Sequence, residues 1–310
     1  MAVLGAVSVL AAVSPAAAAR VQEKNFNLDI ARRVEAILKR ANVPVLMTRT
    51  SDATVSLASR VAKANNRRVD AFVSIHNNSS RNHGRHGTEV YRSIKGGESA
   101  TLGSLLRDEL ARSPGLPTSL NARRGDHGDY YYVLRKTTMP AVIVEGAYVS
   151  NRADARRLAS ASFRQKLAAS IARGILAFQQ TLVARPLPSS PTPNRMVLRG
   201  MDTPADVAGR AINARTVDLS WTPGGAPGYH IYRDGALIGT VWASGESRLT
   251  FSDVWAAPGQ TYGYEIAATL GGDRRTFESP PASVSVVTPP IVVALDPGHG
   301  GRDPGASGSY

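Results

Sequence analysis

Two histidines directly follow apolar, strand-like runs of the sequence. His299 lies in the segment Asp-Pro-Gly-His-Gly-Gly after the run 291–295, and His76 lies in Ser-Ile-His-Asn-Asn after the run 71–75. Glycines allow a loop to pass closely around a small ligand. Imidazole nitrogens at such positions are candidate metal ligands, although each histidine taken alone also fits a structural or solvated role.

Two glutamates add carboxylates to this pair. Glu145 ends the apolar run Ala-Val-Ile-Val, and Glu23 comes just before a helical pattern that starts near Asn25. Ligands of open α/β sheets bind at the carboxyl ends of the strands, so we expect these side chains to meet at one sheet edge. Two histidines and a carboxylate form a catalytic zinc set, and a further carboxylate can act as the general base of metal-assisted hydrolysis.

The surrounding segments predict an α/β fold: a mixed, mostly parallel sheet covered by helices on both faces. Helical periodicity is present at residues 25–41, 57–66, 102–111 and 154–178. Short apolar runs predict strands at 43–48, 71–75, 87–92, 132–134, 141–145 and 291–295.

A small all-β sandwich domain is predicted after a Pro/Ser-rich linker, because short alternating stretches are separated there by turn signals. We expect the following order of segments: a signal-like segment at 1–19, the main part of the α/β domain at 20–183, the linker at 184–195, the sandwich at 196–289, and a return to the α/β domain at 290–310.

Composition narrows the possible functions. The 310 residues include no cysteine, which excludes disulfides, cysteine-ligated metals and cysteine nucleophiles. Residues 195–290 carry 8 basic and 9 acidic residues, whereas the rest of the chain carries 29 basic and 15 acidic residues. The positive net charge of +13 therefore comes from outside the predicted sandwich. This excess indicates an anionic partner. Basic and aromatic residues do not interleave as in nucleic-acid modules, so we expect no nucleic-acid partner.

The first 19 residues are small and apolar and end in Ala-Ala-Ala, which is typical of a secretory signal peptide. This interpretation predicts a secreted, periplasmic or cell-wall-associated protein without a stable membrane span after cleavage. No basic residue precedes Arg20, so an alanine-rich disordered tail is the alternative.

Residues 20–180 and 291–310 together resemble the zinc-dependent N-acetylmuramoyl-L-alanine amidases of the Amidase_3 family. The motifs that carry the resemblance are DPGHGG followed by DPGA, QEKNFNL, SIHNN, GTEVY and PAVIVEGAYVSN. The resemblance implies one zinc ion held by His299, Glu23 and His76. It implies that Glu145 is the catalytic residue, and it assigns two residues to substrate binding: Asn78 and Arg135.

The activity implied by the resemblance is hydrolysis of the amide between N-acetylmuramic acid and L-alanine in peptidoglycan. Peptidoglycan is then the expected partner, and other anionic cell-wall polymers are further candidates because of the basic excess. The alternative is a non-catalytic peptidoglycan-binding protein that keeps the amidase fold.

The order of the motifs departs from the family, in which the DPGHGG strand precedes the glutamate. Here that strand comes last, yet joining Tyr310 to Arg20 would restore continuous family-like sequence. We therefore predict a circular permutation, which surface loops tolerate. Two alternatives stay open: a truncated or mis-assembled tandem sequence, and a C-terminal segment that swaps into a neighbouring chain to give a strand-swapped oligomer.

The sandwich segment resembles a fibronectin type III module. Trp221 follows its second predicted strand, and Thr-Tyr-Gly-Tyr at 261–264 resembles the tyrosine corner of that fold. Its nearly neutral charge favours a spacer over a polyanion-binding module. Trp242 and Trp255 could mark a carbohydrate surface if they are exposed, and membership of the core is the alternative.

Overall fold

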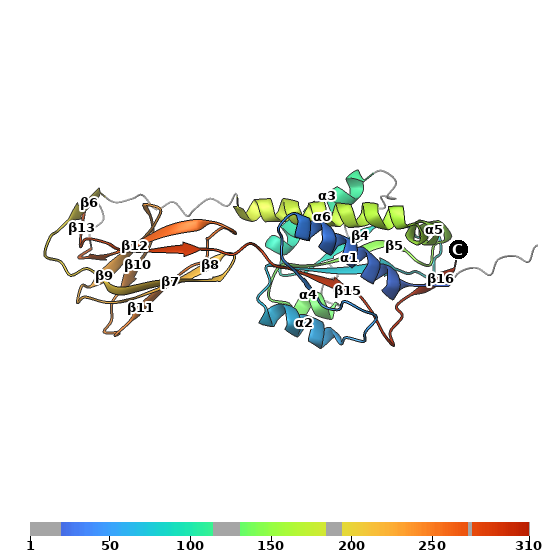
Figure 1. Ribbon diagram of the computed structural model, residues 1–310, viewed down its shortest axis with the longest axis horizontal. Helices are drawn as coiled ribbons and strands as arrows, with labels where there is room; N and C mark the ends of the chain where they lie inside the picture. The colour runs from blue at the N-terminus through green and yellow to red at the C-terminus, as the bar shows by residue number, and fades with distance from the viewer. Residues whose placement is uncertain (1–19, 114–130, 184–193, 272–274, 310) are drawn as a thin grey trace, which may run out of the picture.

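The chain forms an α/β unit and a β-sandwich that lie end to end (Figure 1). The computed structural model describes residues 20–113, 131–183, 194–271 and 275–309. The predicted signal peptide and nearly all of the predicted linker lie outside these residues. Within them, no helix combines the length and apolar character needed to cross a membrane.

A five-stranded mixed sheet forms the centre of the α/β unit, in the order β2-β15-β3-β5-β4. Its first four strands run parallel, and β4 is antiparallel to β5. The strands are β2 (Val45–Met47), β15 (Val293–Pro297), β3 (Ala71–Asn78), β5 (Ala141–Tyr148) and β4 (Glu89–Arg92). The predicted mixed, mostly parallel sheet is thus confirmed.

Strand β15 lies in the middle of this sheet although it comes from the far end of the chain. Val293 pairs with Val45 of β2 on one side and with Ala71 of β3 on the other. Every residue of β15 is buried, as its apolar sequence predicts. The segment that carries His299 is therefore built into the sheet of the same chain.

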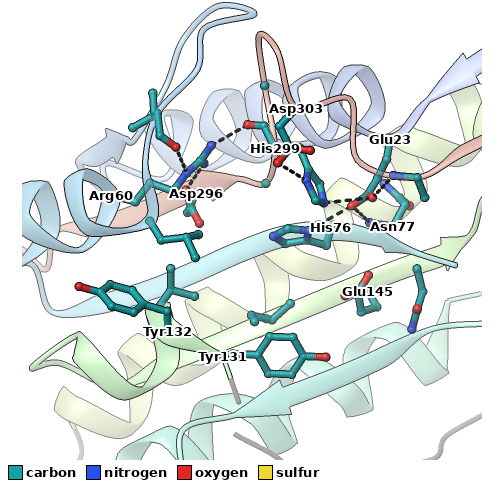
Figure 2. A pocket seen from close by; sticks show the side chains of 18 of the residues that line it. Glu23, Arg60, His76, Asn77, Tyr131, Tyr132, Glu145, Asp296, His299 and Asp303 are labelled. Atoms are coloured by element: carbon teal, nitrogen blue, oxygen red, sulfur yellow. Dashed lines mark hydrogen bonds and ion pairs between the residues drawn. The ribbon is translucent and has the colours of Figure 1, made fainter. Parts of the chain in front are cut away.

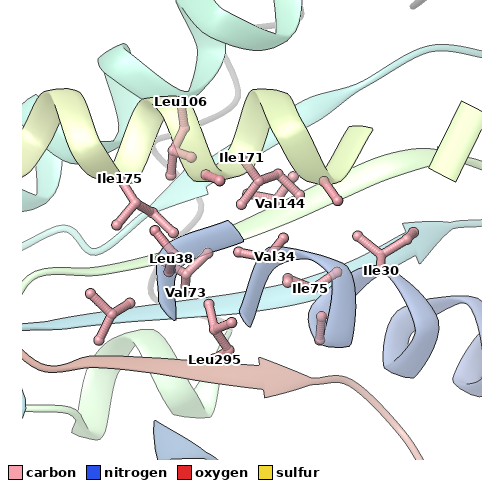
Figure 3. Close-up of a cluster of buried hydrophobic side chains, with 14 of the residues drawn as sticks. Ile30, Val34, Leu38, Val73, Ile75, Leu106, Val144, Ile171, Ile175 and Leu295 are labelled. Carbon is pink, nitrogen blue, oxygen red and sulfur yellow. The ribbon is translucent and has the colours of Figure 1, made fainter. Parts of the chain in front are cut away.

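Helices cover both faces of the sheet (Figure 1). One face carries α1 (Glu23–Arg40), α3 (Glu98–Arg112), α5 (Arg152–Ala159) and α6 (Ala161–Val183), and the other carries α2 (Leu57–Asn66) and α4 (Tyr132–Lys136). Figure 3 shows the larger core, where apolar side chains of α1, α3 and α6 meet those of the central strands. Labelled members include Val34, Leu38, Leu106, Ile171, Val73, Val144 and Leu295. Each such side chain stabilises the fold by about 1.5–3 kcal/mol.

The strand predicted at residues 132–134 is wrong, because this segment forms the short helix α4. Its three apolar residues are too few to show a period. Val133 and Leu134 pack into the smaller core beneath α2, and the Val133 carbonyl accepts a helical hydrogen bond from the Thr137 N–H at 3.2 Å. Tertiary packing thus overrides the strand propensity of Tyr-Val-Leu.

The β-sandwich contains two antiparallel-rich sheets around one core. One sheet holds β10 (Ala236–Trp242), β9 (Gly228–Arg233), β12 (Thr261–Thr269), β13 (Arg275–Glu278), β6 (Asn194–Val197) and β14 (Ala282–Val287). The other holds β11 (Leu249–Asp253), β8 (Thr216–Thr222) and β7 (Ala205–Asn213). Trp221 is fully buried in the core, and the Tyr262 hydroxyl accepts the Ala257 N–H at 2.8 Å.

Trp242 and Trp255 are exposed, by 59% and 38%, so neither belongs to the sandwich core.

A turn of the sandwich packs against the amino-terminal edge of the α/β sheet. Ala214 is buried within the larger α/β core, and the Arg215 guanidinium lies 2.5 Å from Glu98 and 3.8 Å from Asp70. Asp70 in turn exchanges two 2.8 Å hydrogen bonds with the backbone of Val292, just before β15. One ion cluster thus joins the sandwich, β3 and β15.

A short ladder brings the two ends of the α/β unit together. Strand β1 (Arg20–Gln22) pairs antiparallel with β16 (Ser307–Ser309), directly before α1 begins. The Glu23 N–H then donates to the Ala306 carbonyl at 2.9 Å. The start of α1 is therefore fixed by the segment that follows His299.

Candidate metal centre

The three residues expected to hold a metal lie together at the carboxyl edge of the sheet. Glu23 begins α1, His76 lies on β3, and His299 lies in the loop after β15. Glu23 Oε1 lies 3.1 Å from His76 Nδ1, and Glu23 Oε2 lies 3.2 Å from His299 Nε2. One ligand atom from each residue falls within 4.8 Å of the other two. Figure 2 shows the three side chains converging.

The Glu23 carboxylate is held by neighbours from three parts of the chain. Its Oε1 accepts hydrogen bonds from Asn27 Nδ2 and from the Asn77 backbone N–H, both at 3.1 Å. Its Oε2 accepts the Ala306 N–H at 2.9 Å. These donors orient both oxygens before any cation binds, which lowers the reorganisation that binding requires.

The centre favours positive charge beside Glu23. Burial alone would raise the pKa of the Glu23 carboxyl, but hydrogen bonds from His299 and His76 outweigh it and hold the pKa well below its usual range. The hydrogen bond to Glu23 is the main cause that raises the pKa of His299 to about 9. Burial would lower the pKa of His76, yet its hydrogen bond with Glu23 reverses this and raises the pKa. Either protons or a bound cation can supply the positive charge.

Three basic side chains bind the backbone of the loop that carries His299. Four carbonyl groups within residues 297–301 accept hydrogen bonds from Arg49, Arg60 and Lys24, at 2.6 to 2.9 Å. Arg49 and Arg60 are almost completely buried. Charge-assisted hydrogen bonds of this kind are stronger than neutral ones. The loop is therefore held by three residues that lie more than 200 positions earlier in the sequence.

Two backbone features shape the loop around the histidines. A Cβ added to Gly298 would lie 2.0 Å from Cε1 of the His76 ring, so only glycine leaves room for that imidazole. His299 has a φ of 59°, in the left-handed region that few non-glycine residues adopt. Such an outlier persists only when its surroundings enforce it, which the basic residues around the loop do.

Glu145 lies beside His76 because the two residues pair across β3 and β5. The side chain is buried, and its Oε2 has no hydrogen-bond partner among the described residues. Burial is the main cause that raises the pKa of Glu145 to about 7. A carboxylate with a pKa near neutrality and an unused oxygen is suited to accept and return a proton.

A cavity of about 610 Å³ opens over these residues. Its walls come from the loop before α2, the end of β3 and the start of α4 (Figure 2). Residues outside the metal triad that line it include Val55, Leu57, Arg60, Asn78, Tyr131, Tyr132 and Glu145. The volume falls in the range of small-molecule sites.

The two residues predicted to contact substrate are placed differently. Asn78 lines the cavity, and its Nδ2 donates to Glu89 Oε2 at 3.2 Å. Glu89 is buried and also accepts hydrogen bonds from the hydroxyls of Tyr91 and Tyr148. Arg135 is exposed on α4 and is not among the cavity-lining residues, so the geometry does not bring it to the site.

Asp303 and Tyr131 belong to the site although sequence reasoning assigned them no role. Asp303 contacts His299, and both residues line the cavity. The signal for Asp303 is its spacing, four residues after His299 in one glycine-rich loop. Tyr131 carries no comparable signal, because only the fold brings the start of α4 to this cavity.

The residues present fit a zinc ion. Two imidazoles and one carboxylate are the donor set of catalytic zinc sites that keep a position open for water or substrate. The unpartnered Oε2 of buried Glu145, beside His76, points to a polar group lodged at this edge.

Fold and site together define an α/β protein with a candidate metal centre at the carboxyl edge of its sheet. The family model Amidase_3, described as N-acetylmuramoyl-L-alanine amidase, matches residues 11–177, more than half of the chain. The chain belongs to this family.

Individual relatives agree with the family. The N-acetylmuramoyl-L-alanine amidase LytC of Bacillus subtilis is 32% identical over 158 residues, covering 50% of this chain and 31% of the relative. The endolysin of Bacillus phage SPP1 is 36% identical over 166 residues, covering 52% of this chain and 60% of the endolysin. The chain therefore spans less than two thirds of these relatives. The catalytic domain of CwlV from Bacillus (Paenibacillus) polymyxa var. colistinus is 34% identical with a TM-score of 0.46, covering 51% of this chain and 85% of that one.

Proposed function

We propose that the protein is a zinc-dependent N-acetylmuramoyl-L-alanine amidase that cleaves the bond between N-acetylmuramic acid and L-alanine in peptidoglycan. The observation that carries the proposal is the meeting of Glu23, His76 and His299 in one cavity with the unpartnered carboxylate of Glu145. Membership of the amidase family and the names of the relatives support the substrate.

Each residue of the centre has a distinct task in this proposal. Glu23, His76 and His299 hold the zinc, which when bound supplies Lewis-acid polarisation of the amide carbonyl and of water. Glu145 accepts a proton from the attacking water and returns it to the leaving amine of L-alanine. Its buried position keeps the pKa near neutrality, so the carboxylate can perform both transfers.

Asn78 is proposed to contact the substrate next to the reacting bond. Its side chain lines the cavity and is oriented by the buried Glu89. An amide held in this way can donate to a carbonyl of the glycan or the peptide without losing much conformational freedom.

We propose that the chain is a circularly permuted amidase that carries a fibronectin type III-like module. The parallel pairing of β15 with β2 and β3, and the β1–β16 ladder near the start of α1, support the permutation over a strand swap. Burial of Trp221 and the hydroxyl-to-backbone bond of Tyr262 support the module assignment. Light scattering at several concentrations tests the alternative, because a swapped assembly would dissociate or lose activity on dilution.

The proposed location is the bacterial envelope, as a secreted, periplasmic or wall-associated protein. The basic excess of the α/β part supports contact with peptidoglycan and with other anionic wall polymers. We propose no nucleic-acid partner.

The deciding experiment measures zinc content together with hydrolysis of purified cell walls. We expect about one zinc per chain, loss of wall turbidity, and appearance of new L-alanine amino termini, all abolished by a chelator and restored by zinc. A protein that binds zinc and walls but releases no amino termini would be the non-catalytic wall-binding alternative.

A further inference from the structure

The two nitrogens of the His299 ring face two different carboxylates. Nδ1 lies 2.8 Å from Asp303 Oδ2, whereas Nε2 lies 3.2 Å from Glu23 Oε2. When Nδ1 donates its N–H to a carboxylate, Nε2 carries the lone pair of the neutral ring. That nitrogen is then free to bind a cation held together with Glu23 and His76.

Asp303 is itself held firmly in place for this contact. The backbone N–H and carbonyl groups of Gly300 and Asp303 bond to each other in both directions, at 2.8 and 3.1 Å. The second carboxylate oxygen of Asp303 accepts the Gly305 N–H at 3.0 Å. The side chain is therefore fixed at its base and at one oxygen, and the other oxygen is aimed at His299.

Both histidine rings of the centre pack against a glycine, and His299 has a carboxylate partner in addition. The His76 ring is confined by Gly298, where any Cβ would overlap it, and it lies edge-on to the His299 ring at 5.0 Å between centroids. His299 is only partly buried and has an unfavourable backbone φ of 59°. Gly305 packs against the ring, since a Cβ there would lie 2.6 Å from its Cδ2 atom, and the hydrogen bond with Asp303 decides which ring nitrogen faces Glu23.

We propose that Asp303 is a positioning residue that fixes the ring orientation and tautomer of His299, so that Nε2 is the metal-binding atom. This inference rests on the proposed function, because it takes His299 to be a zinc ligand. In this role Asp303 acts through the histidine and not on the reacting atoms. Loss of comparable orienting partners weakens metal binding by about 10- to 100-fold.

Asp52 provides a matched control. It is also a carboxylate at this loop: its Oδ1 accepts the Gly301 N–H at 2.7 Å, and its Oδ2 pairs with Lys24 at 2.7 Å. Asp52 thus contacts the loop that carries His299, but these two contacts involve no histidine. A merely structural role for loop carboxylates would therefore make Asp303→Ala and Asp52→Ala behave alike.

The test measures the zinc dissociation constant by competition with a chelating dye for wild type, Asp303→Asn, Asp303→Ala and Asp52→Ala. We expect affinity to fall about 10- to 100-fold for Asp303→Ala, less for Asp303→Asn, whose amide oxygen can still accept the Nδ1–H, and less than about threefold for Asp52→Ala. Nitrogen-15 NMR of the zinc-loaded protein should show Nε2 coordination and a slowly exchanging Nδ1–H on His299. That proton should exchange faster in Asp303→Ala.

Equal zinc affinity in Asp303→Ala and wild type, with an unchanged His299 spectrum, would overturn the inference while leaving the amidase proposal intact. Equal losses in Asp303→Ala and Asp52→Ala, without a change in ring coordination, would also overturn it by showing a loop-folding role. Wild-type protein that binds no zinc would instead overturn the proposed function itself.

Discussion

The Arg60 guanidinium and the Asp296 carboxylate form a buried ion pair at 2.6 Å that joins α2 to the end of β15. The hydroxyls of Thr48 and Ser74 also donate to Asp296, at 2.6 and 2.7 Å, so both of its oxygens are satisfied. Strand β15 is thus attached to both neighbouring strands by side chains as well as by its backbone.

Breaking this pair should destabilise the whole α/β unit. Asp296→Ala leaves the Arg60 charge buried and uncompensated, which costs about 3–5 kcal/mol. Urea unfolding followed by circular dichroism measures the loss. Arg112→Ala, which removes an exposed ion pair, is the control and should change stability by less than about 0.5 kcal/mol. Similar small effects of both variants would contradict the role given to Asp296.

Glu145→Gln should separate metal binding from catalysis. The amide keeps the size of the side chain but cannot accept the proton of water, so activity should fall by about 100- to 10,000-fold. Zinc content by atomic absorption should stay near that of wild type, because the three ligands are untouched. A Glu145→Gln protein with more than about a tenth of wild-type wall hydrolysis would show that another group is the base.

The stability of the metal-free protein should depend on pH through Glu145. Its folded-state pKa of about 7 lies above the ordinary value of 4.5, so the folded protein binds this proton more tightly than the unfolded chain. The resulting stabilisation is complete below about pH 4.5 and is lost as pH rises through about 7.

Glu145→Gln removes this titration, so the metal-free variant should be more stable than wild type near pH 8, by roughly 1–3 kcal/mol. The difference should vanish near pH 4. Unfolding curves recorded in chelator at both pH values measure it, and an equal difference at both would mean that the effect is steric.

Gly298→Ala should disturb the centre without altering any polar group. The added methyl would overlap the His76 ring, so the ring or the loop must shift and zinc affinity should fall about tenfold or more. Gly103→Ala is the control, because a Cβ there meets its nearest neighbour at 3.4 Å, an ordinary contact distance. Chelator competition measures both variants, and wild-type affinity in Gly298→Ala would refute the steric argument.

Arg215→Ala should loosen the sandwich without affecting the metal centre. The substitution removes the ion pairs with Glu98 and Asp70 at the junction, at the sheet edge opposite the metal triad. We expect faster proteolysis near the junction and a broader distance distribution in solution scattering, with unchanged zinc affinity. Arg210→Ala, at an exposed position of β7, should behave like wild type. Unchanged proteolysis in Arg215→Ala would show that the buried Ala214 contact alone secures the junction.

The sequence predicts the positions of the two histidines of the metal triad because polar residues that directly follow apolar runs lie at the ends of strands. His76 and His299 each follow such a run, and parallel strands carry their ends to one edge. Glu23 is less apparent from periodicity alone, since it opens a helix, and the family resemblance was needed to select it over Glu145 as a ligand.

Other features depend on contacts that no local pattern reveals. The segment 132–134 folds as a helix because α2 and the sheet provide a surface for Val133 and Leu134. Arg49 and Arg60 are buried around the His299 loop, although arginine is rarely buried so fully. Their role depends on carbonyl groups that lie far away along the chain.

The central position of β15 also determines when the α/β sheet can be completed during translation. Strands β2 and β3 emerge from the ribosome early, but the strand that pairs with both arrives after the entire sandwich. Until then the nascent sheet exposes two unpaired edges, which favours association with chaperones or late folding. Because His299 follows β15, the proposed metal centre lacks one of its three ligands until the sandwich has been synthesised.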